Sequence, residues 1–186
     1  MGSRTVAAGH LPRAGHDVQG GAVLRRLITR ALSGGRDPEL VTLRGVPTLP
    51  VSELPALPGF TYPSSRQLGP VQIPAIADPP VVAGVLVQPV GRDGGMPTAS
   101  IELLRLEPGL TEHELDGVVT RLAYGLGGEW STSTYGGTPV HTVLGLTALW
   151  LTLAAVVFRR GDDVVLVFSP NADTAWEVAA AYLEAT

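Results

Sequence analysis

The sequence predicts an α+β fold: an antiparallel β-sheet with two helices packed on one face. Three observations predict it. Two pairs of apolar segments are each joined by a short turn rich in Gly or Asp, which is typical of β-hairpins. A proline and a helix start follow each pair. Hydrophobic residues make up 45% of the 186 residues, which is enough for one packed core.

The first hairpin is predicted from residues 81–90 and 98–106, with the turn at 91–95. A helix follows, because Thr111 and Glu114 have the spacing of a capping box. Apolar residues then recur at helical spacing, which predicts a buried stripe. That stripe consists of Leu115, Val118, Leu122 and Leu126.

The second hairpin is predicted from a long strand at 146–158, a turn at 159–162 and a return strand at 163–168. A further strand is expected over 131–144, bent at the two glycines 136 and 137. Asn171 or Asp173 caps the last helix, whose inner face carries Trp176, Ala179 and Leu183. The chain would thus contain two hairpin-plus-helix units, either by duplication or because a common local solution recurs.

The N-terminal part is predicted to be less regular. Residues 1–20 show no apolar period and are expected to form a disordered tail. Residues 21–80 are expected to form a short helix over 22–32, a strand at the edge of the sheet over 40–43, and a proline-rich arm that packs on the domain. Residues 81–186 form the predicted core domain.

Residues 142–158 carry no charge and precede two arginines, so a membrane-anchored protein with a spanning helix there is one alternative. The run is short for a span and rich in residues that favour strands. A strand buried on both faces would be equally apolar. We therefore prefer a strand and expect a cytoplasmic location. An envelope location stays open if a signal segment has been removed.

Composition excludes several classes of site. The net charge of −4 leaves no basic stripe for nucleic acid, and the absence of cysteine excludes disulfides, thiol catalysis and cysteine-based zinc sites. All thirteen basic residues are arginine, which points to a bacterium of high GC content. No phosphate-binding or dinucleotide-binding motif occurs. The sequence therefore predicts no cofactor and no metal site.

Two histidines are the candidates for chemistry. His113 lies at a predicted helix start among acidic residues, and His141 precedes the apolar run. If the fold brought them together with a carboxylate, a small hydrolase or isomerase would be conceivable. Acidic residues at a helix start also favour the helix dipole, and a half-buried histidine in a strand is common. The enzyme therefore remains the alternative hypothesis.

The first hypothesis is a binding or protein-interaction module without enzymatic activity. Trp130 and Tyr135 flank a polar segment, and aromatic residues in such a setting are typical of partner contacts. The candidate ligand-binding or partner-binding residues are Trp130, Tyr135, His113 and His141. The expected partner is a second copy of the chain, giving a homo-oligomer, or another protein.

Overall fold

The computed structural model of the chain describes residues 40–63, 72–74, 82–148 and 151–186. The predicted tail over 1–20 and the predicted helix over 22–32 lie outside these ranges. In chain order the described elements are β1 (Leu40–Thr42), η1 (Val51–Glu53), β2 (Phe60–Thr61), β3 (Gln72–Pro74), β4 (Val82–Arg92), β5 (Pro97–Leu106), α2 (Glu112–Gly125), β6 (Glu129–Tyr135), β7 (Thr138–Ala148), β8 (Leu151–Arg160), β9 (Asp163–Ser169) and α3 (Ala172–Glu184).

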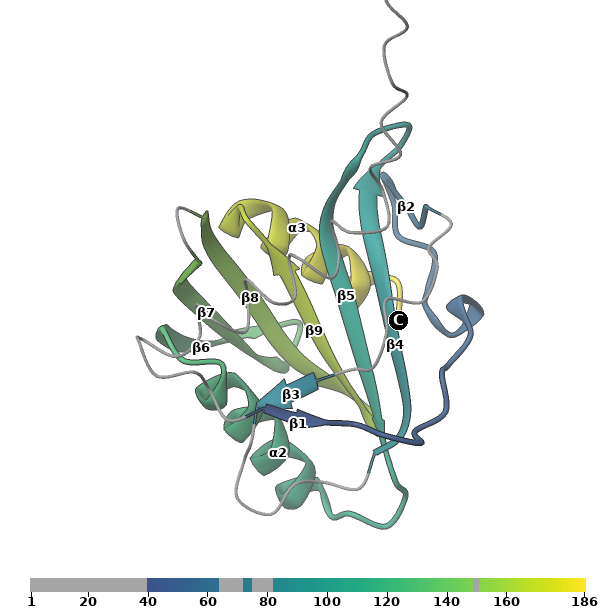
Figure 1. Ribbon diagram of the computed structural model, residues 1–186, viewed down its shortest axis with the longest axis vertical. Helices are drawn as coiled ribbons and strands as arrows, with labels where there is room; N and C mark the ends of the chain where they lie inside the picture. Colours follow the sequence, from purple (N-terminus) through teal and green to yellow (C-terminus); the bar gives the residue numbers. More distant parts are fainter. Residues whose placement is uncertain (1–39, 64–71, 75–81, 149–150) are drawn as a thin grey trace, which may run out of the picture.

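The main sheet confirms the predicted α+β class. It has seven antiparallel strands in the order β2-β4-β5-β9-β8-β7-β6 (Figure 1). The hairpins β4–β5 and β8–β9 lie side by side, because β5 pairs with β9. The strand expected over 40–43 exists as β1, but it pairs with β3 in a separate two-stranded sheet and does not extend the main one.

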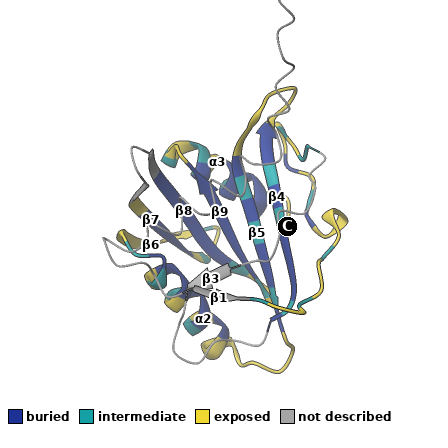
Figure 2. Cartoon of the chain, in the orientation of Figure 1, coloured by how far each residue is buried: buried dark blue, intermediate teal, exposed yellow. Residues whose placement is uncertain are grey.

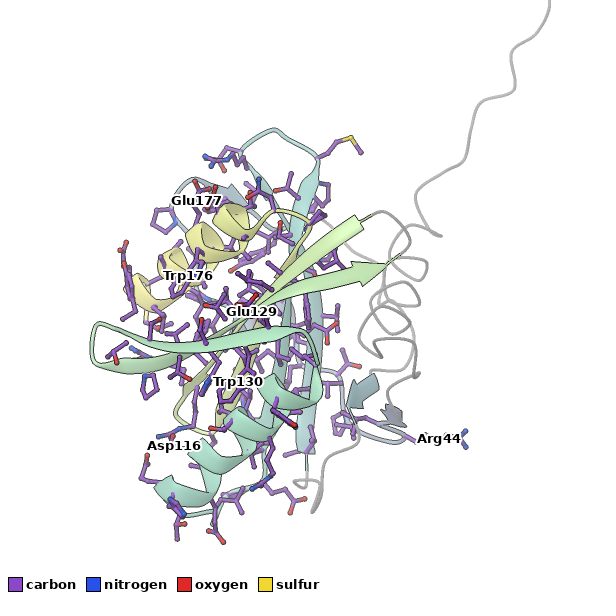
Figure 3. All side chains as sticks on the ribbon, turned by 90° about the vertical axis from the view of Figure 1, so that its left-hand side faces the viewer. Arg44, Asp116, Glu129, Trp130, Trp176 and Glu177 are labelled. Carbon is purple, nitrogen blue, oxygen red and sulfur yellow. The ribbon has the colours of Figure 1, made fainter. Side chains whose placement is uncertain are left out.

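The prediction that both helices pack on one face of the sheet is wrong. Along β9, Val164 and Leu166 belong to the core cluster that contains α2, whereas Val165 and Val167 belong to the cluster that contains α3. Successive side chains of a strand point to opposite faces, so α2 and α3 cover opposite faces. The small β1–β3 sheet lies on the α2 side, as Figures 1 and 3 show.

The apolar character of the central strands explains this arrangement. From Leu153 to Phe158 and from Val164 to Phe168 every residue is buried, so both faces of β8 and β9 need cover (Figure 2). The arrangement also argues against a simple duplication. Two adjacent antiparallel hairpins are related by a two-fold axis perpendicular to the sheet, and such an axis would place both helices on the same face.

The helix signals in the sequence are confirmed. The Thr111 side chain accepts a hydrogen bond from the Glu114 amide, and the Glu114 carboxylate accepts one from the Thr111 amide, which completes the capping box. At the start of α3, the Asn171 side chain accepts a hydrogen bond from the Thr174 amide. The predicted stripe of α2 is buried at all four positions: Leu115, Val118, Leu122 and Leu126.

The described residues of the uncharged run over 142–158 do not form a helix. They belong to β7 and β8, and the long strand expected over 146–158 is divided between these two strands. The alternative of a membrane-spanning helix at this position is therefore wrong. Across the described ranges, none of the helices is both long and apolar enough to cross a bilayer.

The outer edge of β4 is covered by the segment that precedes it. The amide of Leu49 donates to the carbonyl of Val85 at 2.8 Å, and the amide of Val85 donates to the carbonyl of Pro47 at 2.9 Å. Further along, β2 pairs with the end of β4. Leu54 and Leu57 from the same segment are buried in the core on the α3 side. This edge of the sheet is therefore covered at Val85 and at the end of β4.

Candidate functional site

Strand β6 forms the opposite edge of the sheet. It pairs with β7 on one side, and no other strand in the described part of the chain pairs with it. Figure 3 looks onto this edge, with the β6–β7 hairpin crossing in front of the sheet and α2 below it. Residues 129–134 are all exposed, and Tyr135 is half-buried. β6 therefore combines regular strand geometry with an accessible edge.

A turn of two glycines separates β6 from β7. The sequence suggested one strand over 131–144 with a bend, but the chain reverses at Gly136 and Gly137 to form the β6–β7 hairpin. The two glycines have φ values of +55° and +86°. Positive φ at both central residues is the requirement of a type I′ turn, whose twist matches that of the flanking strands. The bend was therefore a hairpin turn.

The turn also determines which backbone groups face outward. In a two-residue hairpin, the residues flanking the turn, here Tyr135 and Thr138, form a hydrogen-bonded pair, and such pairs alternate along the ladder. Residues 133 and 131 therefore bond to β7. Trp130, Thr132 and Thr134 direct their N–H and C=O groups toward the open edge.

An aromatic row lies beside this edge on the α2 face; we use this name for Tyr124, Trp130 and His141. The Tyr124 and Trp130 rings meet edge to face with centroids 6.3 Å apart. The Trp130 and His141 rings are tilted, with centroids 6.0 Å apart. Tyr124 is 69% exposed and Trp130 is 41% exposed, so the row presents apolar surface to solvent next to the free backbone groups.

His141 is the buried member of the aromatic row. Its side chain is buried, and its Nδ1 is 2.9 Å from the Thr132 hydroxyl across the two strands. Burial lowers the pKa of His141, while the negative charge of Asp116 acts in the opposite direction. The lowered pKa keeps the imidazole neutral at neutral pH. His141 thus supports Trp130 and Thr132 as an uncharged group.

The structure brings the rings of Trp130 and His141 into contact, whereas His113 and Tyr135 make other contacts or none with this row. His113 is exposed on the first turn of α2, and Tyr124, which contacts Trp130, lies eleven residues further along. That separation is about 16 Å at 1.5 Å per residue. Tyr135 points to the opposite face, where its hydroxyl donates to Glu184 of α3, and this bond raises the pKa of Tyr135.

Asp116, whose charge acts on His141, is already paired. Arg159 donates from Nε to Asp116 at 3.0 Å and from its terminal nitrogen to Glu112. Among the residues that the structure describes, no group of three His, Asp or Glu side chains is placed to hold a metal ion. The site therefore offers backbone hydrogen bonds and aromatic surface.

Sequence reasoning missed Tyr124 and the outward backbone of β6. Tyr124 lies on the exposed side of a helix, where a single aromatic residue is ordinary. The signal for the edge was present: residues 131–134 are uncharged and polar, include two β-branched threonines, and lack the apolar alternation of a core strand. No protein-family model matches the chain, and no curated protein matches it significantly in sequence.

Proposed function

We propose that the protein is a binding module that engages an extended segment of a protein by adding it as a strand to the outer edge of β6. The contrast between the two edges of the sheet carries this proposal. The β4 edge is covered by preceding chain, whereas the β6 edge is open in the described part of the molecule. Strand addition supplies affinity through exactly such unpaired main-chain groups.

The β6 edge also lacks the usual protection against pairing. Exposed edges normally carry lysine, proline or a bulge, which prevent unwanted association. The strand contains no proline and no basic residue, its only charge is Glu129 at one end, and its register with β7 is unbroken. An accessible edge without protection favours a role in binding.

The aromatic row would add side-chain contacts to the backbone pairing. Trp130 points to the α2 face, because it pairs with Val143, whose side chain packs with α2. An added strand would place alternate side chains on this face, next to Trp130 and Tyr124. Tyrosine and tryptophan are enriched in protein interfaces, so this face would provide selectivity.

The alternative of a hydrolase or isomerase has less support. His113 is exposed on the first turn of α2 whereas His141 is buried in the sheet, and Asp116 is engaged by Arg159. A base with a lowered pKa is compatible with catalysis, but here burial alone accounts for it.

A displayed library of random seven-residue peptides tests the proposal. We expect selection to yield peptides that protect the amides of Trp130, Thr132 and Thr134 from hydrogen exchange. Methylation of alternate backbone nitrogens of a selected peptide should abolish binding, because strand addition uses every second amide. Failure of a monomeric chain to select any peptide, or protection elsewhere on the protein, would contradict the proposal.

The control is a matched pair at position 134. Thr134 lies opposite Pro139 in a pair that does not use its amide. Thr134→Pro removes an outward N–H while leaving the β6–β7 bonds in place, and proline is tolerated on such an edge. Thr134→Val keeps that N–H and the β-branched shape. The first variant should lose peptide binding, and the second should retain it.

A further inference from the structure

The open edge of β6 is complementary to itself. The outward residues Trp130, Thr132 and Thr134 are spaced evenly about Thr132, the middle residue of the strand. We propose, on the basis of the proposed function, that the strand added to β6 is the β6 strand of a second copy of this chain. The result is a two-fold homodimer in which two sheets join into one.

Antiparallel pairing about Thr132 places Thr132 opposite its symmetry mate and Trp130 opposite Thr134 of the other copy. Outward residues that face each other form hydrogen-bonded pairs, each of which exchanges two N–H to C=O bonds. All three outward positions of each strand are therefore satisfied. A shift by two residues in either direction leaves an outward residue unpaired, so the strand length favours this register.

The charges favour the same arrangement. Each chain carries a net charge of −4, so contact between acidic residues would oppose association. In the antiparallel register the single charge of β6, Glu129, faces Tyr135 of the other copy. The two Glu129 residues are then six residues apart along the strands, about 20 Å. A parallel pairing would place them side by side.

The aromatic row fits this dimer. A two-fold axis perpendicular to the sheet keeps α2 of both copies on the same face. Trp130 lies on that face, and its indole would cover Thr132 and Thr134 of the other copy. The two Trp130 residues are four positions apart along the strands, about 13 Å, so they do not collide. The dimer therefore buries the exposed part of both indoles.

A second copy of the chain differs from other binding partners of the β6 edge because it leaves no open edge behind. Pairing through β6 removes the open edge of both chains at once, and the outer edges of the joined sheet are then the covered β4 edges. The assembly stops at two copies without any further partner. Closed two-fold dimers are the commonest oligomers of soluble proteins.

Sedimentation equilibrium from micromolar to millimolar concentration tests the dimer. The wild-type chain and Thr134→Val should reach twice the monomer mass. Thr134→Pro should stay monomeric with an unchanged far-ultraviolet circular dichroism spectrum. A wild-type chain that is monomeric throughout this range, or a Thr134→Pro variant that still dimerises, would overturn the proposal.

Cysteine cross-linking gives an independent test, because the natural chain has no cysteine. Facing residues of a hydrogen-bonded pair have Cα atoms about 5.5 Å apart, within the range of a disulfide. Thr132→Cys should therefore form a disulfide-linked dimer under mild oxidation. Glu129→Cys, on the same exposed strand, should not. Equal cross-linking of both variants would contradict the register.

The outcomes separate this proposal from the proposed function. A monomeric wild-type chain whose peptide binding is lost in Thr134→Pro would overturn the homodimer and retain strand addition to another protein. A Thr134→Pro variant that changes neither property would overturn both. A dimer that is lost in Thr134→Pro supports both.

Discussion

The Thr132 hydroxyl lies 2.9 Å from Nδ1 of His141, and this hydrogen bond joins the edge strand β6 to its neighbour β7 on the α2 face of the sheet. His141 is 6% exposed and Thr132 is exposed, so one partner is protected from water and the other is not. Burial disfavours the charged imidazole and lowers the pKa of His141. The edge strand β6 is therefore hydrogen-bonded to a histidine whose protonation state affects the stability of the fold.

We predict that His141 makes the protein less stable in mild acid. Its pKa in the folded protein lies below the unfolded value of about 6.5, so below that pH the unfolded chain binds more protons. The free energy of unfolding should fall as the pH decreases through this region, and the loss should end below the folded pKa. Urea unfolding at a series of pH values from neutral to mildly acidic measures this change.

The variant His141→Gln should flatten this part of the pH dependence, because glutamine cannot titrate. His113→Gln is the control, since His113 is exposed and lies on the first turn of α2. In this variant the contribution of His141 should persist. Equal slopes for the wild-type chain and His141→Gln would show that His141 is not responsible.

The β6–β7 turn yields a second prediction. Gly137 has φ of +86°, where an L-residue is strained, and open space surrounds the position of a Cβ. Gly137→Ala should therefore destabilise the protein by about 1–2 kcal/mol through backbone strain alone. Gly136→Asn should cost much less, because asparagine tolerates the left-handed region. Urea unfolding compares them, and equal losses would contradict the type I′ turn.

The local elements could be predicted from the sequence because each depends on neighbouring residues. The capping box of Thr111 and Glu114 and the cap at Asn171 use side chains three residues from their partners. The turns depend on glycines within the hairpins. The placement of α2 and α3 on opposite faces is a tertiary property. Its signal, burial at every position from Leu153 to Phe158, was visible only as an apolar run.

The candidate site could be predicted only in part. Trp130 and His141 stood out as an aromatic residue and a histidine, but their contact depends on the β6–β7 register. The hydrogen bond from Thr132 and the contact with Tyr124 depend on it as well. The direction of a backbone N–H in an edge strand follows from the turn, and a prediction of one bent strand over 131–144 could not supply it.

A third prediction concerns the ion pair between Arg105 of β5 and Asp163 of β9. Nε of Arg105 donates to Oδ1 of Asp163 at 2.8 Å, and a terminal nitrogen donates to Oδ2 at 3.0 Å. This bidentate bond to Asp163 raises the pKa of Arg105. A double-mutant cycle with Arg105→Gln and Asp163→Asn should give a coupling energy of about 1 kcal/mol, because both side chains remain partly accessible.

The exposed pair Arg92 and Glu177 is the comparison for this cycle. Its side chains are 65% and 48% exposed. A cycle with Arg92→Gln and Glu177→Gln should give a coupling energy near zero, since single-bonded surface pairs contribute little. Both coupling energies should decrease at high salt. A larger coupling for the exposed pair would contradict the importance of bidentate geometry here.

The last prediction tests the two-sided core through adjacent residues of β5. Leu103 and Leu104 are both 0% exposed, but Leu103 packs with the α3 cluster and Leu104 with the α2 cluster. Each substitution to alanine should reduce the free energy of unfolding by about 2–5 kcal/mol, because each leaves a cavity in a fully buried cluster. A sheet with one covered face would expose one of the two leucines. A decrease in the free energy of unfolding of well under 1 kcal/mol for either variant would therefore contradict a sheet that is covered on both faces.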